Sequence, residues 1–162
     1  FQVDERCVPP DDERSNQRMI REKLIQPLQG LNRTFFTFDT KLPPDEAVAK
    51  YERKLKMEMG DNSFDILIMG IGTDGHTASL FPHSPALKSD ENVAHTQAGD
   101  SEDRLTLTPK ALKTEHVVRL GRGAKTAVIE KLKQGSNSVD DFPAEILRSV
   151  GKKLNISLLK QE

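Results

Sequence analysis

Apolar runs and amphipathic stretches alternate along the 162 residues of this chain. The longest apolar run, FDILIMGIG (64–72), contains almost no polar residues and ends in glycines. Such a run is typical of a strand that is covered on both faces of a sheet. The pattern therefore predicts a central β-strand that leads directly into a glycine-rich turn.

Three further elements, two helices and a strand between them, are predicted before the apolar run. Residues 16–28 place apolar side chains near helical spacing after Ser15, which suits an N-cap, and Pro27 should disturb or end this helix. Residues 43–59 carry acidic side chains in the first turn and apolar ones along one face, which predicts a second helix. Between the two helices, residues 33–39 are expected to form a short strand.

Strands and helices continue to alternate through the rest of the chain. The additional predicted strands are 92–96, 104–109, 116–123 and 154–160, and the additional predicted helices are 124–135 and 141–151. This alternation indicates an α/β fold with a mostly parallel sheet flanked by helices. The length suits a single α/β domain over residues 1–162.

The charge balance limits the partners that we expect. Lysine and arginine total 24, aspartate and glutamate total 25, and the net charge is −1. A nearly neutral chain has no general attraction for nucleic acid or for an anionic membrane surface. The single cysteine, Cys7, excludes an internal disulfide, and no apolar stretch approaches the length of a membrane span. We therefore expect a cytoplasmic protein with no nucleic-acid or membrane partner.

Reactive side chains are expected where predicted parallel strands end, which is where ligands bind in such sheets. The three groups are Asp4–Glu5–Arg6, Asp74–His76–Thr77 and Arg122–Lys125. Glycines 70, 72 and 75 allow a tight or left-handed turn and expose backbone amides. His76, placed before a predicted helical turn, can transfer a proton near neutral pH, and Asp74 is placed to orient its imidazole or to contact a hydroxyl.

Each group also has a purely structural interpretation. Gly-Asp-Gly is a turn by itself, and a single loop histidine is usually a polar surface residue. Arg104 and Lys125 are suited to clamp a phosphate, but isolated cations are most often solvated. The Asp4–Arg6 segment is equally compatible with a surface ion-pair cluster. The position of His76 directly after a buried strand favours the functional interpretation of that group.

Motifs for metals and nucleotides are absent from the sequence. No histidine lies at i, i+4 from another or next to the cysteine, so a metal site finds little support. The chain has no GxxxxGK[ST] loop and no GxSxG nucleophile motif, and GIGTDG lacks the context of a dinucleotide fingerprint. We expect neither a metal nor another cofactor.

Four segments in this order resemble the 6-phosphogluconolactonases. They are DERCVPPDDERSN (4–16), FDILIMGIGTDGHTASLFP (64–82), DRLTLT (103–108) and GRGAK (121–125). The resemblance extends over essentially the whole chain, and GTDGHTASLFP is highly specific to the family. It implies a Rossmann-like fold of the group that includes glucosamine-6-phosphate deaminase, ribose-5-phosphate isomerase and CoA transferases. It also implies hydrolysis of 6-phosphoglucono-1,5-lactone to 6-phosphogluconate in the oxidative pentose phosphate pathway.

The resemblance also implies roles for individual residues. The family's catalytic histidine and its neighbouring aspartate correspond to His76 and Asp74. The implied substrate-binding residues are Asp4, Arg6, Asn16, Gly72, Gly75, Thr77, Arg104 and Lys125, the last two at phosphate-contacting positions of the related deaminases. The expected partner is a phosphorylated sugar lactone, and the protein is expected to be a monomer or a weak homodimer.

Other functions stay open at this point. The related deaminases carry a glutamate where this chain has Phe81, which favours the lactonase, but a deaminase-like isomerase or a non-catalytic sugar-phosphate-binding domain is still possible. The family also has a preceding portion, with a strand and a glycine-serine-threonine loop that helps to hold the phosphate, and this chain has no match to it. We therefore expect the C-terminal part of the family domain, with its N-terminal elements missing, and an inactive chain is a further alternative.

Overall fold

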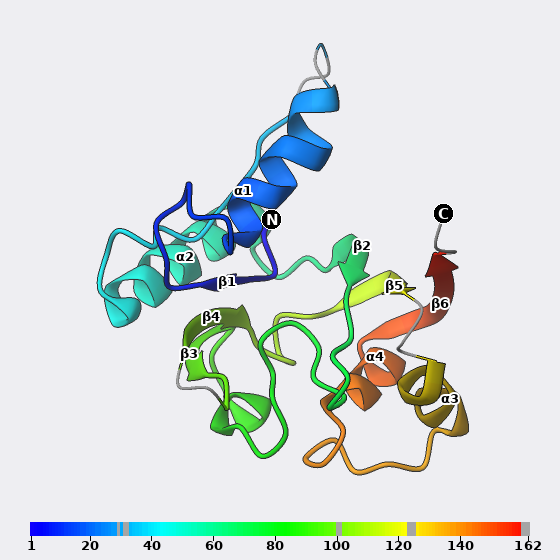
Figure 1. Ribbon diagram of the computed structural model, residues 1–162. Coiled ribbons are helices and arrows are strands. Elements are labelled where there is room, and N and C mark those ends of the chain that lie inside the picture. The colour runs from blue at the N-terminus through cyan, green and yellow to red at the C-terminus, as the bar shows by residue number, and fades with distance from the viewer. Residues whose placement is uncertain (29, 31–32, 100–101, 123–125, 160–162) are drawn as a thin grey trace.

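The computed structural model describes residues 1–28, 30, 33–99, 102–122 and 126–159. Its described strands form two three-stranded sheets, one parallel and one antiparallel (Figure 1). The loop that follows strand β2 runs between the two sheets. Side chains from both sheets can therefore reach this loop, although they are distant in the sequence.

The parallel sheet has the strand order β2-β5-β6. Its strands are β2 (Phe64–Met69), β5 (Thr114–Arg122) and β6 (Gly151–Leu159). Two helices, α3 (Thr126–Gln134) and α4 (Ile146–Ser149), lie together below these strands in Figure 1. The predicted α/β fold with a parallel sheet and flanking helices is therefore confirmed.

The antiparallel sheet has the order β1-β4-β3. Its strands are β1 (Asp4–Arg6), β3 (Val93–Gln97) and β4 (Asp103–Leu107). The expectation that Asp4–Arg6 ends a parallel strand is wrong, because these three residues are themselves the strand and pair antiparallel with 104–106. A short connection between β3 and β4 permits antiparallel pairing only, since a parallel pair needs a long crossover.

The two N-terminal helices form as their sequences predict. Helix α2 (Pro44–Met59) packs against β3 and β4 through a buried face that includes Tyr51 and Leu55. The first helical segment is α1 (Asn16–Ile20), continued by a π-helical turn (Arg21–Ile25) and a 3₁₀ turn (Gln26–Leu28). Its N-cap is Ser15, whose hydroxyl accepts a hydrogen bond from the Arg18 amide. The segment ends one residue after Pro27, as expected from the missing amide of proline.

Two predicted features of the strands are wrong. Residues 33–39 are not a strand, and a single backbone bond, from the amide of Gln2 to the carbonyl of Phe36, joins this segment to the chain start. Among the described residues, strand β2 is covered on one face only, because Ile66 and Ile68 are 59% and 56% exposed. It is an edge strand in the order β2-β5-β6 of the described strands, and its Leu67 and Met69 are buried in the hydrophobic core.

The hydrophobic core runs from α2 across both sheets to α4. Its fully buried members include Phe38, Leu105, Leu107, Phe142 and Leu147. Phe142 belongs to the segment that precedes the 3₁₀ turn Pro143–Glu145 and α4. No helix of the described ranges is both long and apolar enough to cross a bilayer.

Candidate functional site

The turn after β2 is closed by hydrogen bonds within the chain. The amide of Gly72 donates to the carbonyl of His76 at 2.8 Å, and the amide of Gly75 donates to the carbonyl of Gly72 at 3.1 Å. A Cβ atom on Gly72 would lie 2.2 Å from Nδ1 of His76, so only glycine leaves room for the imidazole. Gly75 has a φ of +89°, which L side chains rarely adopt. The turn therefore requires glycine at both positions.

The expected helical turn after His76 does not form. Residues 77–80 make a tight turn instead, in which the amide of Leu80 donates to the carbonyl of Thr77 at 3.0 Å. Ala78 has a φ of 52° in this turn, so the chain leaves the right-handed region that a helix needs. The hydroxyl of Thr77 donates to the carbonyl of Gly70 at 2.8 Å, and its side chain is fully buried.

Asp74 and His76 form a paired carboxylate and imidazole. Nδ1 of His76 lies 2.7 Å from Oδ1 of Asp74, and the same oxygen accepts the backbone amide of His76 at 3.1 Å. A carboxylate acceptor holds the proton on Nδ1, which leaves the Nε2 lone pair available. The two side chains are 33% and 49% exposed, so the pair is reachable from solvent. The ring of Phe81 packs against the imidazole with a centroid distance of 4.8 Å.

The loop that carries His76 is attached to the antiparallel sheet through Ser79. The hydroxyl of Ser79 donates to Oδ2 of Asp4 at 2.8 Å, and its amide donates to the hydroxyl of Thr106 at 3.2 Å. Burial raises the pKa of Asp4, and the hydrogen bond from Ser79 opposes this shift. Ser79 is thus the link between two segments of the sequence that were predicted as separate groups.

Glu5, between Asp4 and Arg6, is a structural carboxylate. It is fully buried and accepts five hydrogen bonds. The donors are the side chains of Gln2 and Ser15 and the amides of Arg6, Asn16 and Gln17. Two of these amides begin α1, so this carboxylate binds the helix N-terminus to β1. The Asp4–Arg6 segment is therefore not a surface ion-pair cluster.

The side chains of Arg6 and Asn16 are hydrogen-bonded to each other beside the Glu5 carboxylate. Nη1 of Arg6 donates to Oδ1 of Asn16 at 2.9 Å and to the carbonyl of Arg14 at 2.7 Å. The amide group of Asn16 donates to the carbonyl of Asp4 at 3.1 Å. Both side chains are therefore ordered by internal contacts before any ligand arrives.

Arg104 lies in β4 directly opposite Arg6 in β1. Its Nη2 pairs with Glu102 at 2.5 Å, and within the described chain its buried Nε has no hydrogen-bond partner. Two guanidinium groups therefore lie on neighbouring strands of one sheet, which suits an anion. Lys125, the other predicted phosphate contact, lies outside the described residues.

A cavity beside Asp74 measures about 660 Å³. Asp74 and Phe81 line it on one side and the edge of β3, including Thr96, lines it on the other, but His76 is not among its lining residues. We therefore place any chemistry at the exposed imidazole rather than in this cavity. Among the described residues, no three His, Cys, Asp or Glu side chains come together as a metal site would require.

The structure brings the predicted residues together as two sets joined by Ser79. His76, Asp74, Gly72, Gly75 and Thr77 share one loop, and Asp4, Arg6, Asn16 and Arg104 share the antiparallel sheet with α1. Sequence reasoning missed Ser79 and Thr106. Their contact spans 27 positions of the chain, and the only signal was their place within the two family motifs.

Comparison with known proteins gives consistent matches. The family described as "Glucosamine-6-phosphate isomerases/6-phosphogluconolactonase" matches residues 1–155. A 6-phosphogluconolactonase of Treponema pallidum is 35% identical over 124 residues, which cover 73% of this chain and 52% of that protein. A 6-phosphogluconolactonase of Borreliella burgdorferi is 31% identical over 171 residues, which cover 100% of this chain and 72% of that protein.

Solved structures match over nearly the same region. The crystal structure of a 6-phosphogluconolactonase from Thermotoga maritima superimposes with a TM-score of 0.80 at 34% sequence identity. The match covers 98% of this chain and 71% of that one. The chain spans about half the length of the Treponema relative. The shared part contains the turn after β2 and the antiparallel sheet.

Proposed function

This chain belongs to the family of glucosamine-6-phosphate isomerases and 6-phosphogluconolactonases, and from that premise we propose that it hydrolyses 6-phospho-D-glucono-1,5-lactone to 6-phospho-D-gluconate. The observation that carries the proposal is the exposed Asp74–His76 pair on the turn after β2. Two of the curated relatives, from Treponema pallidum and Borreliella burgdorferi, are named 6-phosphogluconolactonase. The ring of Phe81 on the imidazole offers no carboxylate for opening a sugar ring.

The pair supplies a general base and then a general acid. Nε2 of His76 takes a proton from water as the water oxygen bonds to C1 of the lactone. When the C1–ring oxygen bond breaks, the imidazolium returns this proton to the departing ring oxygen. Asp74 holds Nδ1 throughout and stabilises the imidazolium. The product acid then ionises in solution.

Backbone amides of the turn are the source of oxyanion stabilisation in this proposal. One well-placed donor contributes on the order of 3 kcal/mol to such a transition state. The amides of Gly72 and Gly75 already donate within the turn. The proposed oxyanion donors are therefore the amides of Thr73 and Asp74, which lie between these two glycines.

The phosphate is proposed to lie on the cationic side of the antiparallel sheet. Arg104 and Arg6 face each other across β1 and β4, and the ordered Arg6–Asn16 contact fixes one of them. Lys125 is proposed to complete the contact. Binding the phosphate at a distance from C1 orients the lactone ring against His76.

The proposal includes the remaining properties expected from the sequence. These are a single domain over residues 1–162, a cytoplasmic location, a monomer or weak homodimer, and no nucleic-acid partner. The net charge of −1 supports the last of these. Sedimentation velocity over a hundredfold concentration range would distinguish a monomer from a weak dimer.

Replacement of His76 tests the proposal. His76→Asn removes the proton acceptor and should lower turnover of the lactone by about 100- to 10,000-fold. His95→Asn is a matched control, because His95 also pairs with a carboxylate, at 2.8 Å from Asp103, and is 31% exposed. The His95→Asn variant should hydrolyse the lactone at the rate of the parent protein.

An unchanged rate in His76→Asn, measured against spontaneous hydrolysis, would refute the proposed role. Circular dichroism and the urea midpoint should match those of the parent protein in both variants. An assay for ammonia release from glucosamine-6-phosphate separates the lactonase from a deaminase, and release at a comparable rate would overturn the substrate assignment.

A further inference from the structure

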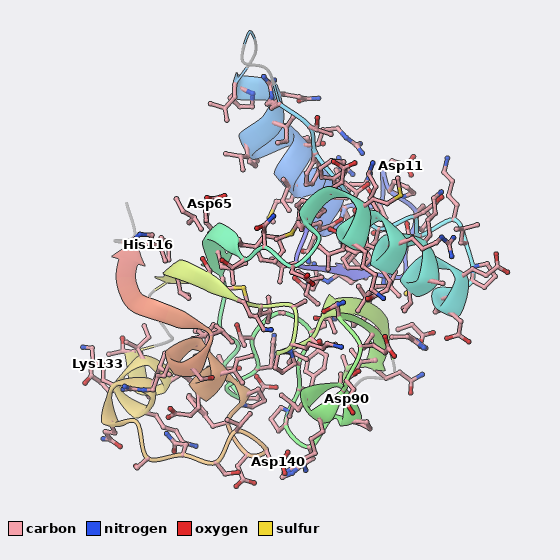
Figure 2. All side chains as sticks on the ribbon, turned by 180° about the vertical axis from the view of Figure 1, so that it is seen from behind. Asp11, Asp65, Asp90, His116, Lys133 and Asp140 are labelled. Carbon is pink, nitrogen blue, oxygen red and sulfur yellow. The ribbon has the colours of Figure 1, made fainter. Side chains whose placement is uncertain are left out.

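The loop that carries His76 is held at both ends by one distant segment, residues 138–145, which we name the brace. The amide of Ala144 donates to the carbonyl of Gly75 at 2.9 Å, one residue before the histidine. The amide of His83 donates to the carbonyl of Asp140 at 2.9 Å, seven residues after it. Figure 2 shows Asp140 at the lower edge of the molecule, on the loop between α3 and α4.

The loop needs external support because its backbone is strained. Gly75, Ala78 and His83 have φ values of +89°, 52° and 63°. Non-glycine residues in this left-handed region persist only where their surroundings fix them. The brace binds the loop at Gly75 and at His83, and the antiparallel sheet binds it between them through Ser79. The external contacts therefore fall at one strained residue, His83, directly after the other, Ala78, and at the left-handed Gly75.

Phe142 is the main side chain of the brace. Only 2% of it is exposed, and its ring fills the space beside Gly75, since a Cβ there would lie 2.3 Å from the ring. The ammonium of Lys131 lies 4.6 Å from the ring centroid, which connects α3 to the same side chain. Phe142 thus supports Gly75, the residue next to His76.

We propose that the brace is a positioning element for His76 and that Phe142 is its principal positioning residue. This inference rests on the proposed function for its effect on rate. A displacement of a catalytic group by about 1 Å costs on the order of 100-fold in rate. Loss of the ring leaves Gly75 unsupported, so the strained loop relaxes and the imidazole departs from Asp74 and from the bound lactone.

The experiment compares Phe142→Leu and Phe142→Ala with Phe38→Leu and Phe38→Ala. Phe38 is a matched control, because it is 1% exposed and stacks on Tyr51 at 3.9 Å, away from the loop. We expect kcat to fall about 10-fold in Phe142→Leu and about 100-fold in Phe142→Ala, with a smaller change in KM. The Phe38 variants should lose stability but keep kcat below their unfolding temperature.

Nitrogen-15 NMR of the imidazole gives a readout that does not need turnover. The parent protein should show His76 mainly as the Nδ1–H tautomer, assigned by its loss in His76→Asn. The Phe142 variants should show a mixture of tautomers, and the Phe38 variants should not. If the parent protein lacks lactonase activity, the proposed function fails while this measurement still tests the brace.

Two results would overturn the inference. One is Phe142→Leu with parental kcat and a single tautomer, a variant conservative enough to fold even if Phe142→Ala does not. The other is an equal loss of kcat in the Phe142 and Phe38 variants at matched stability, which would show that any core defect has the same effect.

Discussion

Two carboxylates at the site, Glu5 and Asp74, lie in opposite environments. Glu5 is fully buried and accepts five hydrogen bonds from β1, α1 and their flanks. Asp74 is 49% exposed, and within the described residues it accepts its hydrogen bonds from the amide and the imidazole of His76. Both residues are acids in segments that the sequence singles out as reactive groups, but only Asp74 was expected to act in catalysis.

The difference shows how to separate structural from catalytic carboxylates. A carboxylate with every lone pair occupied by backbone and side-chain donors has no capacity left for a substrate, and its removal leaves several buried donors unpaired. A carboxylate whose partner is one exposed imidazole adds little to the stability of the fold, since exposed ion pairs contribute about 0–1 kcal/mol. Its effect is therefore expected on the reaction alone.

The largest expected effect is the loss of lactone turnover in the Asp74→Asn variant. An amide in place of the carboxylate no longer fixes Nδ1–H and no longer stabilises an imidazolium, so lactone turnover should fall by about 100- to 10,000-fold. The urea midpoint should change by less than the equivalent of about 1 kcal/mol. Steady-state kinetics and urea unfolding on the same preparation measure both.

Asp103→Asn is the control for Asp74→Asn. Asp103 accepts a comparable hydrogen bond from His95, and it also accepts one from Gln97. This variant should keep its turnover. Equal losses of activity in both variants would show that carboxylate–imidazole pairs act on the fold as a whole, and the contrast with Glu5 would disappear.

The next effect is on stability, in Glu5→Ala. Removal of this carboxylate leaves the Ser15 hydroxyl and the amides of Asn16 and Gln17 without this acceptor, at about 1–3 kcal/mol for each buried donor. The free energy of unfolding should fall by about 3 kcal/mol or more. Chemical unfolding followed by circular dichroism measures it, and Glu13→Ala, at an exposed position, is the control with little change expected. A loss below about 1 kcal/mol would contradict the structural role.

Local patterns were sufficient to predict much of the fold. The apolar run that ends in glycine predicted β2 and its turn, and helical spacing predicted the buried face of α2 with Tyr51 and Leu55. The predicted strand at 33–39 failed because its aromatic residues pack on α2 and the chain start without a partner strand. The face of β2 that is exposed in the described structure was not predicted, because an apolar run does not show what covers each face of a strand.

Long-range contacts explain what could not be predicted at the site. The motif with His76 and Asp74 is local, so both were identified from a few consecutive residues. The loop is held by Ser79 on Asp4, 75 positions away, and by Phe142 on Gly75, 67 positions away. No periodicity links these positions. Asp4 and Glu5 differ in role only because of the partners that folding brings to each.

An intermediate effect is expected from alanine substitutions in the turn. Gly75→Ala introduces a left-handed alanine and a clash with Phe142, so stability should fall by about 2–4 kcal/mol. Gly72→Ala places its Cβ 2.2 Å from the imidazole, so activity should fall more than stability. Gly70→Ala is the control, because no atom lies within 4 Å of its Cβ. Equal kinetics and unfolding midpoints in all three would contradict the geometry of the turn.

The smallest expected effect is on the pH dependence of stability, in Asp4→Asn. Burial raises the pKa of Asp4, so between its unfolded and native values the native state holds a proton that the unfolded state has lost. Stability contributed by this residue is therefore present at low pH and is lost as pH rises through that window. Asparagine cannot ionise, so the stability of Asp4→Asn relative to the parent protein should increase from acid to neutral pH.

Asp39→Asn provides a control with the opposite sign. A hydrogen bond from Lys50 lowers the pKa of Asp39, so its contribution is present at neutral pH and is lost as pH falls through the lowered value. Urea midpoints of the parent protein and of both variants, measured between pH 3 and pH 7, give the change with pH in the relative stability of each variant. A relative stability of Asp4→Asn that is flat or decreases toward neutral pH would mean that the Asp4 carboxylate is charged without penalty.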